Sequence, residues 1–285
     1  MENRQNQNGL SLRKFWGRVV QYLVLSVFLI IIVTPIVLVV FGALKTRGEF
    51  ATQPYTVPAP PHWENFQRIL GQPSFYIMLR NSLVVMVGSV IGTVVFASLA
   101  AFTFSRMRFR GQTLLVNIAL LGLMFPLNIA ILPVYLIVKD LGLIDNLWGL
   151  ILPQVAFGLA TNILILRGFF TAVPSELQDA AYIDGCSTFG FFWRILLPLA
   201  RPALSAVAVL AMLGSWNGYF LPLTVLNSEK WYTLPLGTMQ FVGQYGSEQN
   251  MVMAFLFLTM FPALIFYIFA ERQIVSGLTA GALKG

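Results

Sequence analysis

The stretch LVVMVGSVIGTVVFASLAAFTF, residues 83–104, carries no charged side chain and is long enough to cross a hydrocarbon core of about 30 Å, which needs roughly 20 helical residues. Lipid offers the backbone no hydrogen-bond partners, so the stretch must satisfy its own N–H and C=O groups as a helix. Five more stretches are also long enough to cross and lack Asp, Glu, Lys, Arg and His: residues 22–44, 113–138, 147–166, 203–226 and 251–270. The sequence therefore predicts an all-α, polytopic membrane protein whose six transmembrane helices form one domain, residues 22–270.

The overall composition also indicates a membrane protein, since 57% of the 285 residues are hydrophobic and only 10% are charged. Basic residues precede the first apolar stretch, as in a secretory signal, but that stretch is too long for a signal peptide and no small-residue cleavage site follows it. We therefore expect a retained first helix. The single cysteine, Cys186, excludes an intrachain disulfide and a cysteine-rich metal site. A net charge of +7 is better explained by basic cytoplasmic loops than by nucleic-acid binding.

The distribution of basic residues predicts the orientation of the chain. With a cytoplasmic amino terminus, twelve of the 18 Lys and Arg residues lie inside, and Arg106, Arg108 and Arg110 form the clearest cluster. Both terminal segments, residues 1–21 and 271–285, are then cytoplasmic. Residues 45–82, 139–146 and 227–250 become exterior loops. The first should begin extended because it is rich in proline, and the third either meets an exterior partner or forms an interfacial aromatic belt.

The longest cytoplasmic loop, residues 167–202, is strongly patterned. Ser175 and Gln178 form a plausible capping box after Pro174 and begin a short helix. One face of this helix carries Leu177, Ala180, Ala181 and Asp184. Gly185 is placed to end the helix in the left-handed conformation.

A second short helix follows in the same loop. Ser187 or Thr188 can cap it, and Pro198 interrupts it. Its expected shared face consists of Phe189, Phe192, Trp193 and Leu196. Two short helices joined by a glycine turn make a rigid knob on which Ala180 and Ala181 allow another backbone to approach. The alternative is an amphipathic connector that lies in the membrane interface.

The spacing within this loop resembles the EAA loop of ABC-importer permeases. Asp179-Ala180-Ala181 is followed after three residues by Gly185 and later by Ile195-Leu196-Leu197-Pro198. Asp179 replaces the usual Glu, which keeps the negative charge but shortens the reach of the side chain. The resemblance implies a coupling helix that sits in a groove of an ATP-binding subunit. The coupling residues it implies are Glu176, Asp179, Ala180, Ala181, Asp184, Gly185, Phe189, Ile195, Leu197 and Pro198.

The resemblance extends along the chain to carbohydrate-uptake permeases, the shorter permease of maltodextrin-like systems in particular. The similar segments are residues 214–217, 233–237 and the tail 277–285. The family implies a type I ABC-importer architecture in the cytoplasmic (inner) membrane of a bacterium or archaeon. It also implies three kinds of partner: a second permease, either a homologue or a second copy, two ATP-binding subunits, and an exterior solute-binding protein. The tail residues Gly281, Lys284 and Gly285 are then expected near the ATP-binding subunits.

The energy for transport is expected to come from other chains. The sequence has no G-x-x-x-x-G-K-[ST] phosphate loop, so we expect no cofactor here and ATP with Mg²⁺ on the partner subunits. A stand-alone channel or ion-coupled carrier is disfavoured because the six stretches hold no ionisable residue. A membrane enzyme is disfavoured because His62 and Cys186 are expected on opposite sides of the bilayer.

An uncharged passage suits a neutral, hydroxylated solute, such as a sugar, better than a metal ion. The alternative is a non-sugar solute such as a polyol or glycerol phosphate. Polar side chains are available to line the path, although hydrogen bonds between helices would explain them equally well, and the partner permease could hold the sugar instead. The candidate path residues are Asn128, Asn162, Trp216, Asn217 and Tyr219. Gly88 and Gly92 form a G-x-x-x-G step that allows close helix packing.

Overall fold

The computed structural model describes residues 2–124, 126–243 and 246–282, and these residues are mostly helical. In chain order the elements are α1 (Glu2–Ala43), α2 (Arg47–Thr52), α3 (Glu64–Leu70), α4 (Pro73–Arg106), α5 (Gln112–Leu121), η1 (Gly122–Met124), α6 (Ile131–Asp140), α7 (Trp148–Ala172), α8 (Ser175–Ile183), α9 (Thr188–Phe191), η2 (Phe192–Leu196), α10 (Leu197–Leu199), α11 (Arg201–Trp216), α12 (Phe220–Val225), η3 (Glu229–Trp231), η4 (Leu234–Phe241), β1 (Val242–Gly243), β2 (Gly246–Ser247) and α13 (Gln249–Ala282). The element η2 is a π-helix, and η1, η3 and η4 are 3₁₀ helices. The two short strands pair antiparallel.

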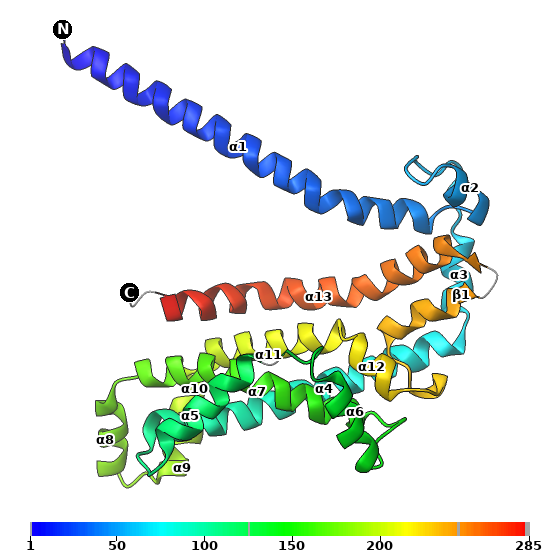
Figure 1. Cartoon of the computed structure of the whole chain (residues 1–285). Coiled ribbons are helices and arrows are strands. Elements are labelled where there is room, and N and C mark those ends of the chain that lie inside the picture. Colours follow the sequence, from blue (N-terminus) through cyan, green and yellow to red (C-terminus); the bar gives the residue numbers. More distant parts are fainter. Residues whose placement is uncertain (1, 125, 244–245, 283–285) are drawn as a thin grey trace. The chain divides into compact units, whose positions relative to one another are not determined.

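The chain divides into two compact units. The smaller unit comprises Met1–Ile69 and Phe241–Leu258, and the larger comprises Leu70–Gln240 and Thr259–Gly285. Within the larger unit, α8 and α9 lie at one end and α6 and α12 at the other (Figure 1).

Four of the predicted transmembrane stretches correspond to unbroken apolar helices. Among the described residues, the helical segments long and apolar enough to cross a membrane are Trp16–Ala43, Pro73–Arg106, Trp148–Ala172 and Gln249–Ile268. They contain most of the stretches predicted at residues 22–44, 83–104, 147–166 and 251–270. The first of these helices exposes most of its apolar side chains between Trp16 and Val37.

The other two predicted stretches are each interrupted. Residues 113–138 divide into α5 with η1 and, after a break that contains Pro126, α6. Residues 203–226 divide into α11 and α12, which are separated at Asn217–Tyr219. Pro222 explains the second break, because a continuous helix would bring its ring against the carbonyl of Gly218; restarting at Phe220 places Pro222 in the first turn.

The larger unit is built on the packing of α4 against α7, with α11 on α4. The Gly88–Gly92 step lies on the α4–α7 contact. A Cβ atom at Gly88 would lie 2.8 Å from Ile151 Cδ1, and one at Gly92 would lie 2.7 Å from Val155 Cγ2. An added Cβ would push the Ile151 or Val155 side chain aside, so the glycines let the two helices approach closely without such a shift.

The smaller unit is organised around Lys45, whose side chain is buried. Its Nζ donates hydrogen bonds to the backbone oxygens of Gln53 and Pro54, and the Nδ2 groups of Asn65 and Asn250 both donate to its backbone oxygen. The prediction that the loop of residues 45–82 begins extended is wrong for its first residues, which form α2 behind the capping box of Thr46 and Glu49; residues 53–62, where the prolines lie, form no helix, and the Ala59–Pro60 peptide bond is cis.

Candidate functional site

The patterned loop forms two short arms, residues 174–199, which we call the elbow. Its first arm is α8, which begins directly after α7 ends. Pro174, with φ −55° and ψ 138°, occupies the N-cap position and has no side-chain donor or acceptor. The predicted capping box of Ser175 and Gln178 is therefore wrong, because Ser175 is already inside the helix. The Gln178 amide instead donates to Tyr182 Oη at 2.9 Å.

The end of α8 agrees with the prediction for Gly185. This residue has φ +79°, in the left-handed region that favours glycine. Its N–H donates to the Tyr182 oxygen at 3.0 Å, and the Cys186 N–H donates to the Ala181 oxygen at 2.8 Å. This pair of bonds is the Schellman motif, which satisfies the last carbonyls of the helix and fixes the turn between the arms.

The second arm begins at the predicted cap Ser187, whose hydroxyl accepts a hydrogen bond from the Gly190 N–H at 3.0 Å. After α9 the chain widens into the π-helix η2, in which the Leu197 N–H donates to the Phe192 oxygen. The wider turn shifts the phase of the side chains. The predicted shared face is consequently wrong for Phe189 and Trp193, which are exposed, while Phe191 takes an inward place.

The inward side of the elbow packs against the ends of α4 and α7. The Phe192 ring lies with its centroid 4.9 Å from that of Phe102 on α4. Phe191 and Leu196 are fully buried in the same cluster, together with Leu166 and Phe170 of α7. Ala181 is the buried residue that α8 contributes. The elbow therefore sits on a rigid apolar base rather than hanging from a flexible loop.

The outward side of the elbow presents apolar side chains to its surroundings. Ile183 is 87% exposed, Phe189 60% and Trp193 55%, and Leu177 is also exposed. We call these four residues the exposed apolar set. The sequence reasoning missed Ile183, because it follows the Ala180-Ala181 pair and has no place in the family pattern.

The structure places the other predicted coupling residues around the exposed apolar set. Glu176, Asp179, Ala180, Asp184, Gly185 and Pro198 are exposed, and Ile195 and Leu197 are half-buried. The carboxylates of Glu176, Asp179 and Asp184 form no ion pair within the part of the chain that the structure describes. Their charges therefore remain available to a partner. After the elbow the chain bends by 78° into α11.

A cavity of about 310 Å³ lies among α4, α7 and α11, and we call it the polar cavity for its polar side chains, although Leu127, Phe157, Leu210 and Ala211 also line it and most of its lining surface is apolar. Its polar lining residues are Ser89, Thr93, Gln154, Thr161, Asn162 and Ser215. Ser89 Oγ donates to Gln154 Oε1 at 2.8 Å, and Asn162 Nδ2 donates to the Gly158 oxygen at 2.8 Å.

Two oxygens of this cavity lack a partner. Asn162 Oδ1 and Ser215 Oγ are buried and form no hydrogen bond, and Asn162 as a whole is only 4% exposed. Leaving a buried polar atom unpaired costs about 1–3 kcal/mol. A hydroxyl-bearing molecule or water in the cavity would pair these atoms only if the two side chains turned toward it, because neither oxygen is accessible as the side chains stand.

Of the candidate path residues, only Asn162 lines this cavity. Asn128 and Asn217 are exposed elsewhere. Trp216 is buried instead: its Nε1 donates to the Thr259 oxygen at 3.3 Å, and its ring packs edge-on against Phe266. Tyr219 packs against Phe220. Ser89 and Thr93 were not among the candidate path residues, although their four-residue spacing beside the glycine step places both on one helix face.

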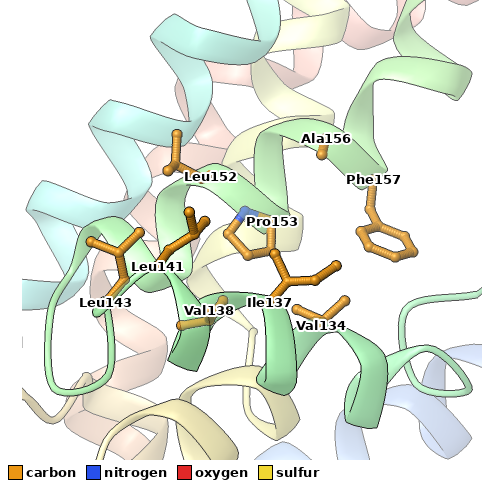
Figure 2. Close-up of a pocket in the computed structure, with 9 residues that line it drawn as sticks. All are labelled: Val134, Ile137, Val138, Leu141, Leu143, Leu152, Pro153, Ala156 and Phe157. Carbon is orange, nitrogen blue, oxygen red and sulfur yellow. The ribbon is translucent and has the colours of Figure 1, made fainter.

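A second cavity, of about 220 Å³, lies between α6 and α7 and is wholly apolar. Figure 2 shows Val134, Ile137 and Val138 of α6 on one side and Leu152, Pro153 and Phe157 of α7 on the other. Leu141, Leu143 and Ala156 complete the lining. It offers no hydrogen bond to a hydroxylated solute, so the polar cavity is the better candidate solute site.

At the opposite end of the larger unit from the elbow, Asp145 joins two of the predicted exterior loops. Its Oδ1 accepts hydrogen bonds from the N–H groups of Asn227 at 2.6 Å and Ser228 at 2.9 Å. The backbone bonds from Ser228 and Asn227 hold the pKa of Asp145 below its usual value. Asp145 also has φ +54°, which is unusual for a residue with a Cβ.

The predicted tail residues lie at the end of the chain. Gly281 belongs to α13, whereas Lys284 and Gly285 lie outside the described residues. Among the described residues no group of three His, Cys, Asp or Glu side chains could hold a metal ion.

Comparison with known proteins gives a consistent result. The sequence pattern described as "Binding-protein-dependent transport system inner membrane component" matches residues 93–274. The diacetylchitobiose uptake system permease protein DasC of Streptomyces coelicolor is 33% identical, over 96% of this chain and 99% of that protein. The arabinooligosaccharides transport system permease protein AraQ of Bacillus subtilis is 31% identical, over 88% of this chain and 90% of that protein.

Two solved structures resemble this chain in fold. One is a crystal structure of a bacterial ABC transporter involved in the import of the acidic polysaccharide alginate, with a TM-score of 0.80 and 23% identity over 91% of this chain and 96% of that chain. The other is a bacterial alginate ABC transporter in complex with an alginate pentasaccharide-bound periplasmic protein, with a TM-score of 0.68 and 14% identity over 91% of this chain and 94% of that chain.

Proposed function

Because this chain belongs to the family of binding-protein-dependent transport system inner membrane components, we propose that it is the permease subunit of an ABC importer for a sugar or oligosaccharide. The named relatives are permease proteins for diacetylchitobiose and for arabinooligosaccharides, which supports a carbohydrate as the solute. A subunit of this kind is a transport protein and not an enzyme. A non-sugar solute such as a polyol or glycerol phosphate is the less favoured alternative.

The proposed topology has six membrane crossings. Four are the unbroken helical segments, and two are the interrupted pairs α5–α6 and α11–α12. Residues 201–225 would span roughly 37 Å if they were all helical, enough for one crossing despite the break. An even number of crossings puts both termini on one side, and the excess of basic residues assigns that side to the cytoplasm.

The elbow is the proposed docking site for an ATP-binding subunit. The single observation that carries this proposal is that a Schellman turn and a buried aromatic base hold the elbow rigid while Ile183, Phe189 and Trp193 remain exposed. Large apolar side chains on a rigid, rimmed surface are typical of a docking site. The two ATP-binding subunits would bind ATP and Mg²⁺, and the tail around Gly281, Lys284 and Gly285 would lie close to them.

Two further partners complete the proposed importer. A second permease, a homologue or another copy of this chain, would form the other half of the passage. A solute-binding protein would deliver the sugar at the exterior loops.

The polar cavity is the proposed contact between this chain and its solute. Asn162 and Ser215 line the cavity, and once their side chains turn toward it the amide oxygen can accept a hydrogen bond from a sugar hydroxyl and the serine hydroxyl can donate or accept one. No charged side chain lines the cavity, which favours a neutral solute. If the partner permease alone holds the sugar, water would occupy this cavity instead.

The coupling role can be tested with the purified importer in proteoliposomes. Gly185→Pro removes an N–H donor and cannot adopt φ +79°, so it should abolish ATP-dependent uptake while the protein still inserts. Gly111→Pro is the matched control, because Gly111 also has a positive φ, +89°, but lies in another loop. Normal uptake by the Gly185 variant would contradict the proposal.

A further inference from the structure

The last turn of α4 carries an arginine that binds the end of another helix. A guanidinium nitrogen of Arg106, Nη2, donates hydrogen bonds to the backbone oxygens of Phe170 and Val173. Phe170 lies in the last turn of α7 and Val173 is its C-cap residue; the Phe170 oxygen also accepts a long bond from the Val173 N–H at 3.4 Å. A cation at this end also interacts favourably with the helix dipole. Arg106 therefore caps α7 from a neighbouring helix.

The position of this contact relates it to the elbow. Val173 directly precedes Pro174, where the elbow begins. One turn before Arg106 on α4, Phe102 contacts Phe192 in the second arm of the elbow. Residues four apart share a helix face, so one face of α4 contacts both the residue that precedes the elbow and the elbow's second arm.

The contact is specific to this arginine among its neighbours. Arg106 is half-buried and forms no ion pair with any described residue, and its Nε is buried without a partner. Arg108 and Arg110 are exposed, and no hydrogen bond or ion pair joins either to a described residue. Arg106, Arg108 and Arg110 contribute equally to the positive charge that orients the chain in the membrane. Orientation alone therefore does not explain why Arg106 is half-buried.

The same helix lines the polar cavity. Ser89 and Thr93 lie 17 and 13 residues before Arg106 on α4, which corresponds to about 25 and 20 Å along a helix. The helix is continuous between them, so a displacement of its cytoplasmic end is passed to the cavity without a flexible joint. Arg106 and Phe102 are thus the points at which the elbow can move α4.

We propose that Arg106 is a positioning residue that transmits movement of the elbow to α4 and thereby couples ATP hydrolysis to opening of the polar cavity. The proposal rests on the proposed function of the elbow. Without the two hydrogen bonds to Phe170 and Val173, only apolar packing joins the end of α4 to α7 and the elbow, so this end of α4 follows their movement less closely. ATP is then hydrolysed without a matching movement of solute.

The test is the number of ATP molecules hydrolysed per solute molecule imported by the reconstituted importer. Arg106→Gln should retain the ATP-binding subunits and their hydrolysis but raise this ratio about tenfold, a typical size for a coupling between sites. Arg106→Lys, which keeps the charge and can reach one carbonyl, should restore most of the coupling. Arg108→Gln is the matched control and should keep the wild-type ratio.

Three results would overturn the proposal. If Arg106→Gln keeps the wild-type ratio of ATP hydrolysed to solute imported and only lowers the amount of protein in the membrane, Arg106 serves folding and not coupling. Loss of the bound ATP-binding subunits in that variant would mean that Arg106 shapes the elbow surface. If Arg106→Gln does not accumulate, an unchanged ratio in Arg106→Lys counts against the proposal. Failure of the proposed function itself is distinguishable, because the wild-type chain would then show no ATP-dependent uptake.

Discussion

Replacing Asn162 by leucine should separate stability from transport, because the two are expected to change in opposite directions. Asn162 is only 4% exposed and its Oδ1 is unpaired, so the native structure already bears a cost of about 1–3 kcal/mol at this atom. Leucine is of similar size and removes that cost. It also removes the bond from Nδ2 to the Gly158 oxygen, worth about 1 kcal/mol. The free energy of unfolding should therefore rise by roughly 0–2 kcal/mol.

Transport by the same variant should become weaker. If Asn162 donates to or accepts from a solute hydroxyl, its loss removes about 1.4 kcal/mol of solute binding and raises the apparent KM about tenfold. Thermal unfolding of the purified chain and uptake at varied solute concentration measure the two effects. The control is Asn117→Leu, the same substitution at an exposed position of α5. An Asn162 variant that unfolds more easily by more than ~2 kcal/mol and keeps its KM would refute the reasoning, because the amide would then be a structural contact.

Four more predictions follow from particular contacts. Gly92→Leu should destabilise the larger unit by about 3 kcal/mol in thermal unfolding, since a Cβ there would lie 2.7 Å from Val155, whereas Gly168→Leu, in open space, should change little. Asp145 has a lowered pKa, so its stabilising effect should be present at neutral pH and disappear as the pH falls through that pKa. Asp145→Asn should therefore flatten the acid side of the curve of stability against pH, and an unaltered curve would mean that the hydrogen bonds to Asp145 do not stabilise the fold. Lys45→Met removes the ammonium donor from the carbonyls of Gln53 and Pro54, so the loop of residues 53–62 should be cut faster by protease than in the wild type. Ile183→Asp should reduce co-purification of the ATP-binding subunits at least tenfold, while Val57→Asp, at a residue 69% exposed in the loop of residues 53–62, should not.

Features that depend on local chain chemistry could be predicted from the sequence. Gly185 in the left-handed conformation and Ser187 as a helix cap both follow from residue type and spacing, and both are confirmed. The four unbroken apolar helices follow from length and the absence of charge. The family itself followed from the spacing of Asp179, Gly185 and Pro198.

Features could not be predicted where neighbouring residues favour different local structures. Ser175 looked like a cap, but Pro174 already takes that position. The second arm was expected to follow the α-helical period, but the π-helix shifts its phase and turns Phe189 and Trp193 outward. Hydropathy alone also does not detect that the helices end near Pro126 and Gly218, because it measures how apolar a stretch is and not whether its residues can continue a helix.

The polar cavity required tertiary information. Ser89, Gln154 and Ser215 are far apart in sequence and belong to three different helices, and no periodicity within one helix brings them together. Trp216 looked like a sugar-stacking residue beside Asn217, yet its ring is buried against Phe266. The pairing of helices, which decides such cases, is not encoded in any single segment.

The docking of the elbow against an ATP-binding subunit can be measured most directly through the chain's single cysteine. Cys186 lies in the turn between the two arms of the elbow and is partly accessible. A photoactivatable crosslinker attached to it in the assembled importer should capture the ATP-binding subunit, and the yield should change when ATP is added. Capture of the exterior solute-binding protein, or labelling of Cys186 only from outside the cell, would contradict the account.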